Sequence, residues 1–361
     1  MTVAELLAEL VAIPTQQGGG DELRLCEHLA PRLAARGADQ VVVERAPRSD
    51  GSPGAYVFAR WGTPRRIINA HVDTVPANAG WSRDPWQPHV DRAAGKLYGL
   101  GAADTKGAIA ATLIALERCA PEDVGVLFSG DEEAGSAVMH AFLASPHARD
   151  IREAIVCEPT ARTAGIAHRG VLAQYATFVG RGGHSSKADT MPKPIVELAR
   201  LAVALDQLGV ARLHDGPPGM TGTCLNVSAL RGGVAFNVVP ERGELEWSLR
   251  PYPGFDRAGW QAAVAAAAPG LPITTTIDHA PFALRDDSPL AALAAPFARA
   301  LGPLDFWTEA ALFAARGIDA IVIGPGDIAQ AHAADEFVAL DDLDWAVELY
   351  RGVLGGASGP T

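Results

Sequence analysis

The chain has 361 residues, of which 48% are hydrophobic and 20% are charged. This length and composition predict a folded protein of two domains and exclude a disordered or low-complexity chain. The formal net charge of −12 argues against nucleic acid or an anionic membrane as partner. No apolar run reaches the roughly 18 residues of a membrane span. The opening MTVAELLAEL indicates a helix rather than a signal peptide, because no basic segment precedes its apolar residues.

The four cysteines, Cys26, Cys119, Cys157 and Cys224, are widely dispersed and form no CxxC pair. This spacing argues against a disulfide framework and against a zinc site made of thiolates. We therefore expect a protein of the reducing cytoplasm.

Short apolar runs of strand length recur along the chain, and helical patterns separate them. The predicted strands cover residues 39–46, 55–61, 65–71, 124–130, 153–159 and 319–326. Helices are predicted over 107–120 and 340–354, where apolar residues recur at helical spacing. This alternation predicts an α/β fold with a mostly parallel sheet.

The middle of the chain has a different pattern. Strand, helix, strand, strand, helix and strand are predicted in that order over 171–180, 193–208, 223–230, 243–252, 256–268 and 272–280. This β-α-β-β-α-β order is typical of a small ferredoxin-like domain. We place it at residues 170–277, as an insertion into a larger domain made of residues 1–169 and 278–361.

Imidazole and carboxylate groups follow five separate strand or loop ends. In an open parallel sheet, ligands bind beyond the carboxyl ends of the strands. Each residue alone has an ordinary structural explanation; the aspartate before Thr-Lys-Gly, for example, can cap a helix. The set consists of His71 and Asp73, Asp104, the run Asp131, Glu132 and Glu133, then Glu158 and finally His332.

Carboxylates gathered at one edge would repel one another, and cations can offset that cost. Two imidazoles and three carboxylates suit zinc, cobalt or manganese. They suffice for two ions about 3.5 Å apart if one carboxylate bridges them. The pattern therefore favours a dinuclear metallohydrolase.

Five motifs, HVDTVP, GLGAADTKG, DEEAG, CEPT and HAADEF, resemble the metal-site motifs of the M20 metallopeptidase and deacylase family. The resemblance implies that His71, Asp104 and Glu158 hold one ion, and that Asp104, Glu133 and His332 hold the other. Zinc is the first expectation for the metal. The resemblance also implies that Glu132 is the general base, that Asp73 orients His71, and that the peptide bond after Asp104 is cis.

The inserted segment carries GRGGHSS, which also matches the family. The match implies a lid and dimerisation domain in a homodimer, and it implies that His184 stabilises the oxyanion across the dimer interface. Without the match, His184 would be as typical of a surface turn. His168, in AHRG, and Asp131 receive no role.

Further stretches resemble the acetylornithine deacetylase and succinyl-diaminopimelate desuccinylase branch. Arg250, in SLRP, offers a planar fork for a substrate carboxylate, or forms an ordinary ion pair. Asn237, in FNVVP, donates to the substrate or shapes a turn. Trp307 and Glu309 stand where the family usually has Gly and Asp. Trp307 either reshapes the substrate pocket or packs in the core, and Glu309 meets either the substrate or a structural partner.

The stretch DFWTEAALF and the following GPGDIAQAHAADEF resemble the acetylornithine deacetylase-like proteins that include N-acetylcitrulline deacetylase. The resemblance predicts hydrolysis of the N-acetyl group of a small N-acyl amino acid, N-acetylornithine or N-acetylcitrulline, in arginine biosynthesis. A desuccinylase and a dipeptidase of the same family are the enzymatic alternatives. A non-catalytic binding protein is disfavoured, because every expected ligand position and Glu132 are present.

Overall fold

The computed structural model describes residues 1–355, and the chain divides into two compact units. Unit 1 contains Met1–Ile166, Leu284–Gly302 and the residues from Thr308 onward, whereas unit 2 contains Ala167–Ala283 and Pro303–Trp307. That unit 2 acts as a lid and dimerisation domain stays a prediction.

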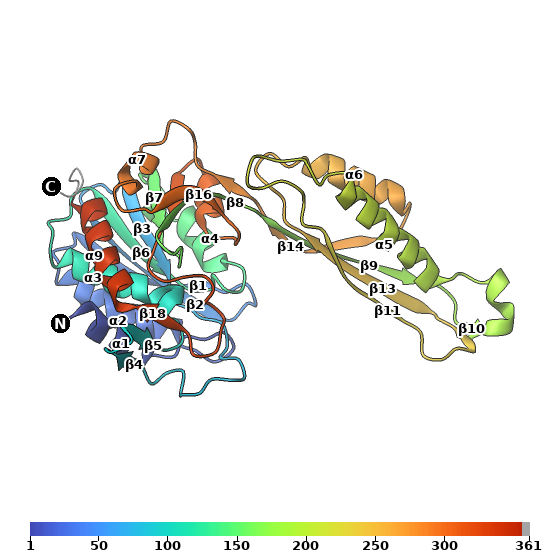
Figure 1. Cartoon of the computed structure of the whole chain (residues 1–361), viewed down its shortest axis with the longest axis horizontal. Coiled ribbons are helices and arrows are strands. Elements are labelled where there is room, and N and C mark those ends of the chain that lie inside the picture. The colour runs from blue at the N-terminus through green and yellow to red at the C-terminus, as the bar shows by residue number, and fades with distance from the viewer. Residues whose placement is uncertain (356–361) are drawn as a thin grey trace. The chain divides into compact units, whose positions relative to one another are not determined.

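The main sheet of unit 1 has the strand order β1-β2-β6-β3-β7-β17-β8. Figure 1 labels β1, β2, β3, β6, β7 and β8 of this sheet. The central strands β6, β3, β7 and β17 are parallel, and the edges of the sheet are antiparallel. Every residue of β6 is buried, as expected of a strand covered on both faces. The fold is therefore α/β with a mostly parallel centre, as predicted. The strands are β1 (Gln40–Pro47), β2 (Pro53–Trp61), β3 (Arg66–His71), β6 (Val124–Ser129), β7 (Glu153–Val156), β8 (Thr163–His168) and β17 (Asp319–Val322).

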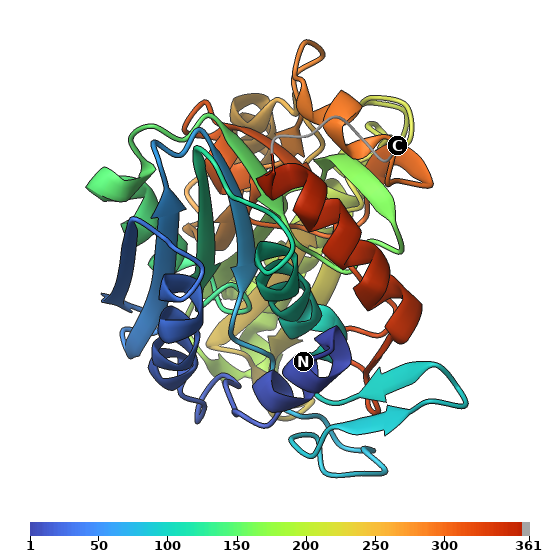
Figure 2. The ribbon, with the colours of Figure 1, turned by 90° about the vertical axis from the view of Figure 1, so that its left-hand side faces the viewer.

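Helices cover both faces of this sheet. Val57 and Ala59 of β2 belong to the core that includes α1, α2, α3 and α9, and Figure 2 shows these helices together. Tyr56 and Phe58 point the other way and pack on Phe142 of α4. The helices are α1 (Val3–Val11), α2 (Glu22–Ala34), α3 (Gly107–Leu116), α4 (Ala137–Ala144), α7 (Leu290–Ala294), α8 (Ala310–Ala314) and α9 (Leu340–Leu354). Among the described residues, none of the helices is long and apolar enough for a membrane span.

Shorter strands complete the first unit and its connections. A small antiparallel sheet has the order β18-β5-β4. Two further short strands pair with β8. Their bounds are β4 (His89–Asp91), β5 (Lys96–Tyr98), β18 (Phe337–Ala339), β15 (Phe282–Ala283) and β16 (Ala300–Leu304).

Unit 2 is an antiparallel sheet of order β11-β13-β9-β14 with helices α5 and α6. Its core contains the fully buried Trp260 of α6 and Trp247 of β13. The chain order is β-α-β-β-α-β, which agrees with the predicted ferredoxin-like pattern. The elements are β9 (Val171–Val179), β10 (Gly183–His184), α5 (Pro194–Val210), β11 (Asn226–Gly232), β12 (Val238–Val239), β13 (Arg242–Leu249), α6 (Arg257–Ala267) and β14 (Ile273–His279).

Candidate functional site

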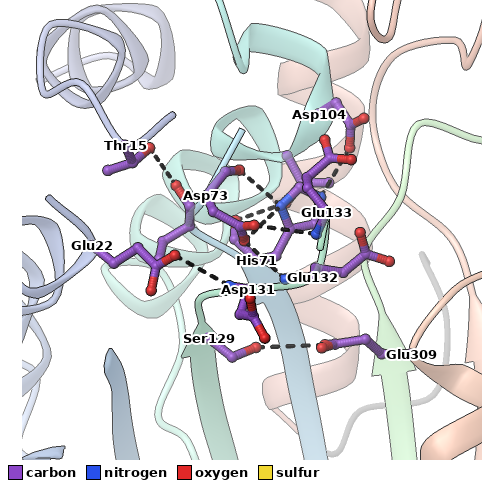
Figure 3. A network of polar contacts seen from close by, with 12 residues as sticks. Thr15, Glu22, His71, Asp73, Asp104, Ser129, Asp131, Glu132, Glu133 and Glu309 are labelled. Carbon is purple, nitrogen blue, oxygen red and sulfur yellow. Dashed lines mark hydrogen bonds and ion pairs between the residues drawn. The ribbon is translucent and has the colours of Figure 1, made fainter. Parts of the chain in front are cut away.

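The polar residues predicted for the metal site all belong to unit 1, and most of them lie at the carboxyl ends of its central strands, whereas Asp104 follows β5 of the small sheet. His71 is the last residue of β3, the three acids follow β6, and Glu158 follows β7. Figure 3 shows Asp73, Asp104, Glu132 and Glu133 gathered around His71. Parallel strands bring segments that are distant in the sequence to one edge of the sheet, which explains the gathering.

Asp104 lies between the two predicted histidine ligands. His71 Nε2 is 3.0 Å from Asp104 Oδ1, and His332 Nε2 is 3.5 Å from Asp104 Oδ2. His332 Nε2 is also 3.1 Å from the Glu133 carboxylate. Ligand atoms of His71, Asp104 and Glu133 lie within 4.8 Å of one another, a spacing that a metal ion can bridge. The Asp104–Thr105 peptide bond is cis, as the family resemblance implied.

Ionising the carboxyl groups of this cluster is costly in the protein without bound metal. Burial raises the pKa of Glu132 and of Glu158 well above the usual range, and neighbouring carboxylates raise them further. Burial likewise raises the pKa of Glu133. Cations bound among these groups would remove both costs. The buried nitrogen and oxygen donors, without a thiolate, fit zinc, cobalt or manganese.

His71 is held in the tautomer that a metal ligand needs. Its Nδ1 donates to the main-chain oxygen of Asp73 at 2.9 Å, which leaves Nε2 facing Asp104. Burial lowers the pKa of His71, but hydrogen bonds with Asp104 and Asp73 outweigh that effect and raise it.

The Asp73 carboxylate reaches the acidic loop as well as the histidine. It accepts hydrogen bonds from the main-chain N–H groups of Glu132 at 3.2 Å and Glu133 at 3.1 Å. It lies 3.6 Å from His71 Nδ1. One buried acid therefore connects the end of β3 to the loop after β6, a wider set of contacts than the sequence indicated.

Glu336 is a site residue that the sequence reasoning did not single out. Its buried carboxylate accepts hydrogen bonds from the N–H groups of Gly101, Ala103 and Asp104, at 2.9, 2.8 and 3.1 Å. Burial, aided by the charge of Asp104, raises its pKa to about 8. Glu336 holds the loop that carries Asp104. The only sequence signal was its place in the HAADEF motif.

Asp131 has a structural place within a buried ionic cluster. Its carboxylate accepts from the N–H and hydroxyl of Ser49, at 2.9 and 2.7 Å, and from the N–H of Ala137 at 2.8 Å. Arg48 lies 3.6 Å from Asp131 and 3.3 Å from the buried Glu22. Asp131 has a φ of 68°, so these contacts hold a turn that sends the next two acids toward the site.

Glu309 lies in the interior of unit 1, with a side chain turned toward the end of β6. Only 1% of the residue is exposed, and its Oε2 is 3.5 Å from Ser129 Oγ (Figure 3). Burial raises its pKa to about 7, partly countered by nearby His71. Ser129 is a structural neighbour of Glu309, and the substrate-binding role of Glu309 stays a prediction.

The remaining predicted residues belong to unit 2, where His184 and Asn237 are neighbours. His184 of β10 pairs with Val238 of β12, and the N–H of Ser185 donates to the carbonyl of Asn237 at 3.0 Å. Arg250 follows β13, and its carbonyl accepts a hydrogen bond from Arg169 at 3.1 Å.

The other two residues left open, His168 and Trp307, also lie in unit 2. Trp307 donates through Nε1 to the carbonyl of Ala280 at 3.1 Å. The ring centroid of His168 is 5.2 Å from that of Phe282 and 6.3 Å from that of Trp307. Trp307 is half-buried and contacts residues of unit 2, and both of its sequence-based alternatives stay predictions.

The fold is that of known metallopeptidases. The chain superposes on the crystal structure of an M20 family metallo-carboxypeptidase from Sulfolobus solfataricus with a TM-score of 0.77, over 98% of each chain and at 16% identity. Residues 67–355 match the family model described as peptidase family M20/M25/M40. The chain therefore belongs to this family, and it is a hydrolase.

Two curated relatives are similar over most of their length. The chain is 38% identical to the N-acetyl-L-citrulline deacetylase of Xanthomonas campestris pv. campestris over 335 residues, which cover 87% of each protein. It is 30% identical to a succinyl-diaminopimelate desuccinylase of Stenotrophomonas maltophilia, over 80% of this chain and 83% of the relative.

Proposed function

We propose that the protein is a dinuclear metal-dependent deacetylase that hydrolyses N-acetylcitrulline or N-acetylornithine to acetate and the free amino acid. Arginine biosynthesis is the corresponding pathway. The observation that carries the proposal is the cluster of His71, Asp104 and Glu133 with Glu132 beside it. The similarity to N-acetyl-L-citrulline deacetylase supports the substrate class.

His71, Asp104 and Glu158 would hold one ion, and Asp104, Glu133 and His332 would hold the other. Zinc is our first choice, with cobalt and manganese as the alternatives that this donor set allows. When bound, two such ions would polarise the amide carbonyl and make a water molecule more acidic.

Glu132 would act as the general base and then as the general acid. Its buried carboxylate has a raised pKa, which suits a group that must take up and release a proton. It would accept a proton from the attacking water and deliver it to the leaving nitrogen when the C–N bond breaks. Asp73 would position Glu132 through the hydrogen bond to its N–H.

The unit 2 residues would bind the rest of the substrate. The N–H of Ser186 donates to His184 Nδ1 at 3.2 Å, so the neutral ring carries its proton on Nε2 and can donate to an oxyanion. The exposed Arg250 would bind the substrate α-carboxylate, and Asn237 would offer a further donor.

We also propose a homodimer formed through unit 2. Val196, Val203 and Val210 recur every seven residues on α5 and are 41, 58 and 59% exposed. β11, at one edge of the sheet, exposes Val227 and Leu230. A row of apolar side chains on one helix face and a free sheet edge are both suited to self-association.

The compartment that we propose is the cytoplasm. All four cysteines are free in the structure, and Cys26 and Cys157 are buried. Free thiols agree with a reducing compartment.

The test is acyl release from a panel of N-acetyl amino acids and N-succinyl-diaminopimelate, with the protein loaded with zinc or with cobalt. We expect acetate from N-acetylcitrulline or N-acetylornithine, and a loss of release after treatment with a chelator. Faster release of succinate would favour the desuccinylase alternative, which the Stenotrophomonas relative supports. Binding without release of any acyl group would show that the protein is not a hydrolase of these compounds.

A further inference from the structure

His332 differs from the other predicted ligands because its side chain is largely exposed and is therefore not fixed by packing. Its side chain is 54% exposed, whereas that of His71 is 2% exposed. It lies in residues 323–336, which join β17 to β18 without helix or regular strand. An exposed imidazole on an irregular segment keeps more freedom, and binding a metal would have to remove that freedom.

The backbone around His332 is also in an unfavourable conformation. His332 has a φ of 60° and Asp335 a φ of 56°. Both values lie in the left-handed region that residues other than glycine rarely adopt. Such a conformation persists when the surroundings hold it in place.

A second irregular segment supplies contacts at both of these residues. Asn78 Nδ2 donates to the main-chain oxygen of His332 at 2.8 Å. The N–H of Ser82 donates to Asp335 Oδ1 at 2.9 Å. Both donors lie in the stretch between β3, which ends at His71, and β4. The segment that follows His71 therefore fixes the backbone around His332.

We propose that Asn78 is a positioning residue that holds His332 ready for the ion shared with Glu133 and Asp104. This inference rests on the proposed metal centre and assigns it a further residue. In this role Asn78 acts through the main-chain oxygen of His332 and is not itself a metal ligand. The Ser82–Asp335 contact stabilises the same segment three residues farther along.

The experiment is a Zn²⁺ titration of the metal-free full chain, followed by calorimetry, with the visible spectrum of the Co²⁺ form as a second readout. In Asn78→Ala we expect one of the two ions to bind about tenfold more weakly, at the lower end of what loss of a supporting hydrogen bond costs a metal site. Asp335→Ala should weaken the same ion. Ser82→Ala is the matched control, because Ser82 donates through its main-chain N–H, which alanine keeps. This variant should bind both ions as tightly as the wild type does.

A double-mutant cycle separates positioning from a general structural effect. Because Asn78 acts through His332, Asn78→Ala should cause no further loss of affinity in a His332→Ala background. Wild-type affinity for both ions in Asn78→Ala would overturn the inference, and so would an equal loss with or without His332. If the wild type binds two ions and releases no acyl group, the proposed function fails while this inference stands.

Discussion

Apart from the exposed His332, the predicted functional groups of the two units are held in opposite ways. In unit 1, Asp73 and Glu336 are buried and accept hydrogen bonds from the main chain of the loops that carry the predicted ligands. In unit 2, His184 and Arg250 are exposed. A cation site gains from ligands that are already dehydrated and fixed, because binding then costs little reorganisation. Groups that meet a substrate or a second subunit can stay in water until that partner arrives.

Replacement of the predicted base should have the largest effect and should affect chemistry alone. We expect Glu132→Gln to lower kcat by about 10²- to 10⁴-fold, because the amide cannot take up the proton. Metal content should stay at the wild-type level. The neighbouring Glu133→Gln is the matched comparison and should lose metal. Equal metal loss in both variants would contradict the different roles of these two adjacent acids.

Removal of the exposed histidine of unit 2 should affect turnover and leave the metals in place. We expect His184→Ala to lower kcat by about 10²- to 10³-fold, the usual cost of one oxyanion donor. Its melting temperature and metal content should not change, because the side chain is exposed. The control is His214→Ala, an exposed histidine of the same unit without a predicted role. Reduced metal content in His184→Ala would show that the units do not divide the work in this way.

The buried acids of unit 1 should make the metal-free protein less stable as the pH rises. Glu309 titrates near 4.5 when unfolded and at about 7 when folded, so the folded state keeps a proton that the unfolded state has lost. The contribution of protonated Glu309 to the unfolding free energy amounts to at most about 3 kcal/mol. It is fully present below about pH 4.5 and is lost as the pH rises through about 7.

Glu309→Gln tests this contribution, because glutamine does not titrate. The unfolding free energy of the metal-free protein, measured with denaturant between pH 5 and 8, should fall less steeply in the variant than in the wild type. Glu22 and Glu336, whose pKa values burial raises to about 7 and 8, should keep part of the slope. Identical slopes would mean that Glu309 is ionised in the folded protein throughout this range.

The smallest expected effect is on the oligomeric state and comes from a change on the surface of α5. Val203→Asp places a charge in the middle of the exposed valine row, so we expect it to shift the protein from dimer to monomer in sedimentation velocity. Metal content should be unchanged, since unit 1 supplies every predicted ligand. The control is Leu301→Asp, at an exposed apolar position of unit 1. An unchanged sedimentation coefficient for Val203→Asp would exclude this face from the interface.

The sequence predicted the architecture well because strands and helices have distinct apolar periods. The runs that end at His71 and precede Asp131 are short, apolar and followed by polar residues, so strand, edge and candidate ligands could be placed together. The family motifs supplied the order of the ligands. Neither the apolar periodicity nor the motifs predict which main-chain groups a side chain will form hydrogen bonds with. The contacts of Asp131, Glu336 and Asn78 therefore appeared only in the structure.

By itself the sequence determined the α/β class, the inserted β-α-β-β-α-β pattern and the collection of acids and histidines at strand ends. These follow from local periodicity and from the rule that parallel strands share an edge. Only the tertiary structure decided how the acids differ. Asp131 supports a turn against Ser49, Asp73 holds the acidic loop, and Glu309 faces Ser129 in the interior. The reason is physical: a carboxylate's role depends on its burial and on the donors around it, which come from segments far apart in the chain.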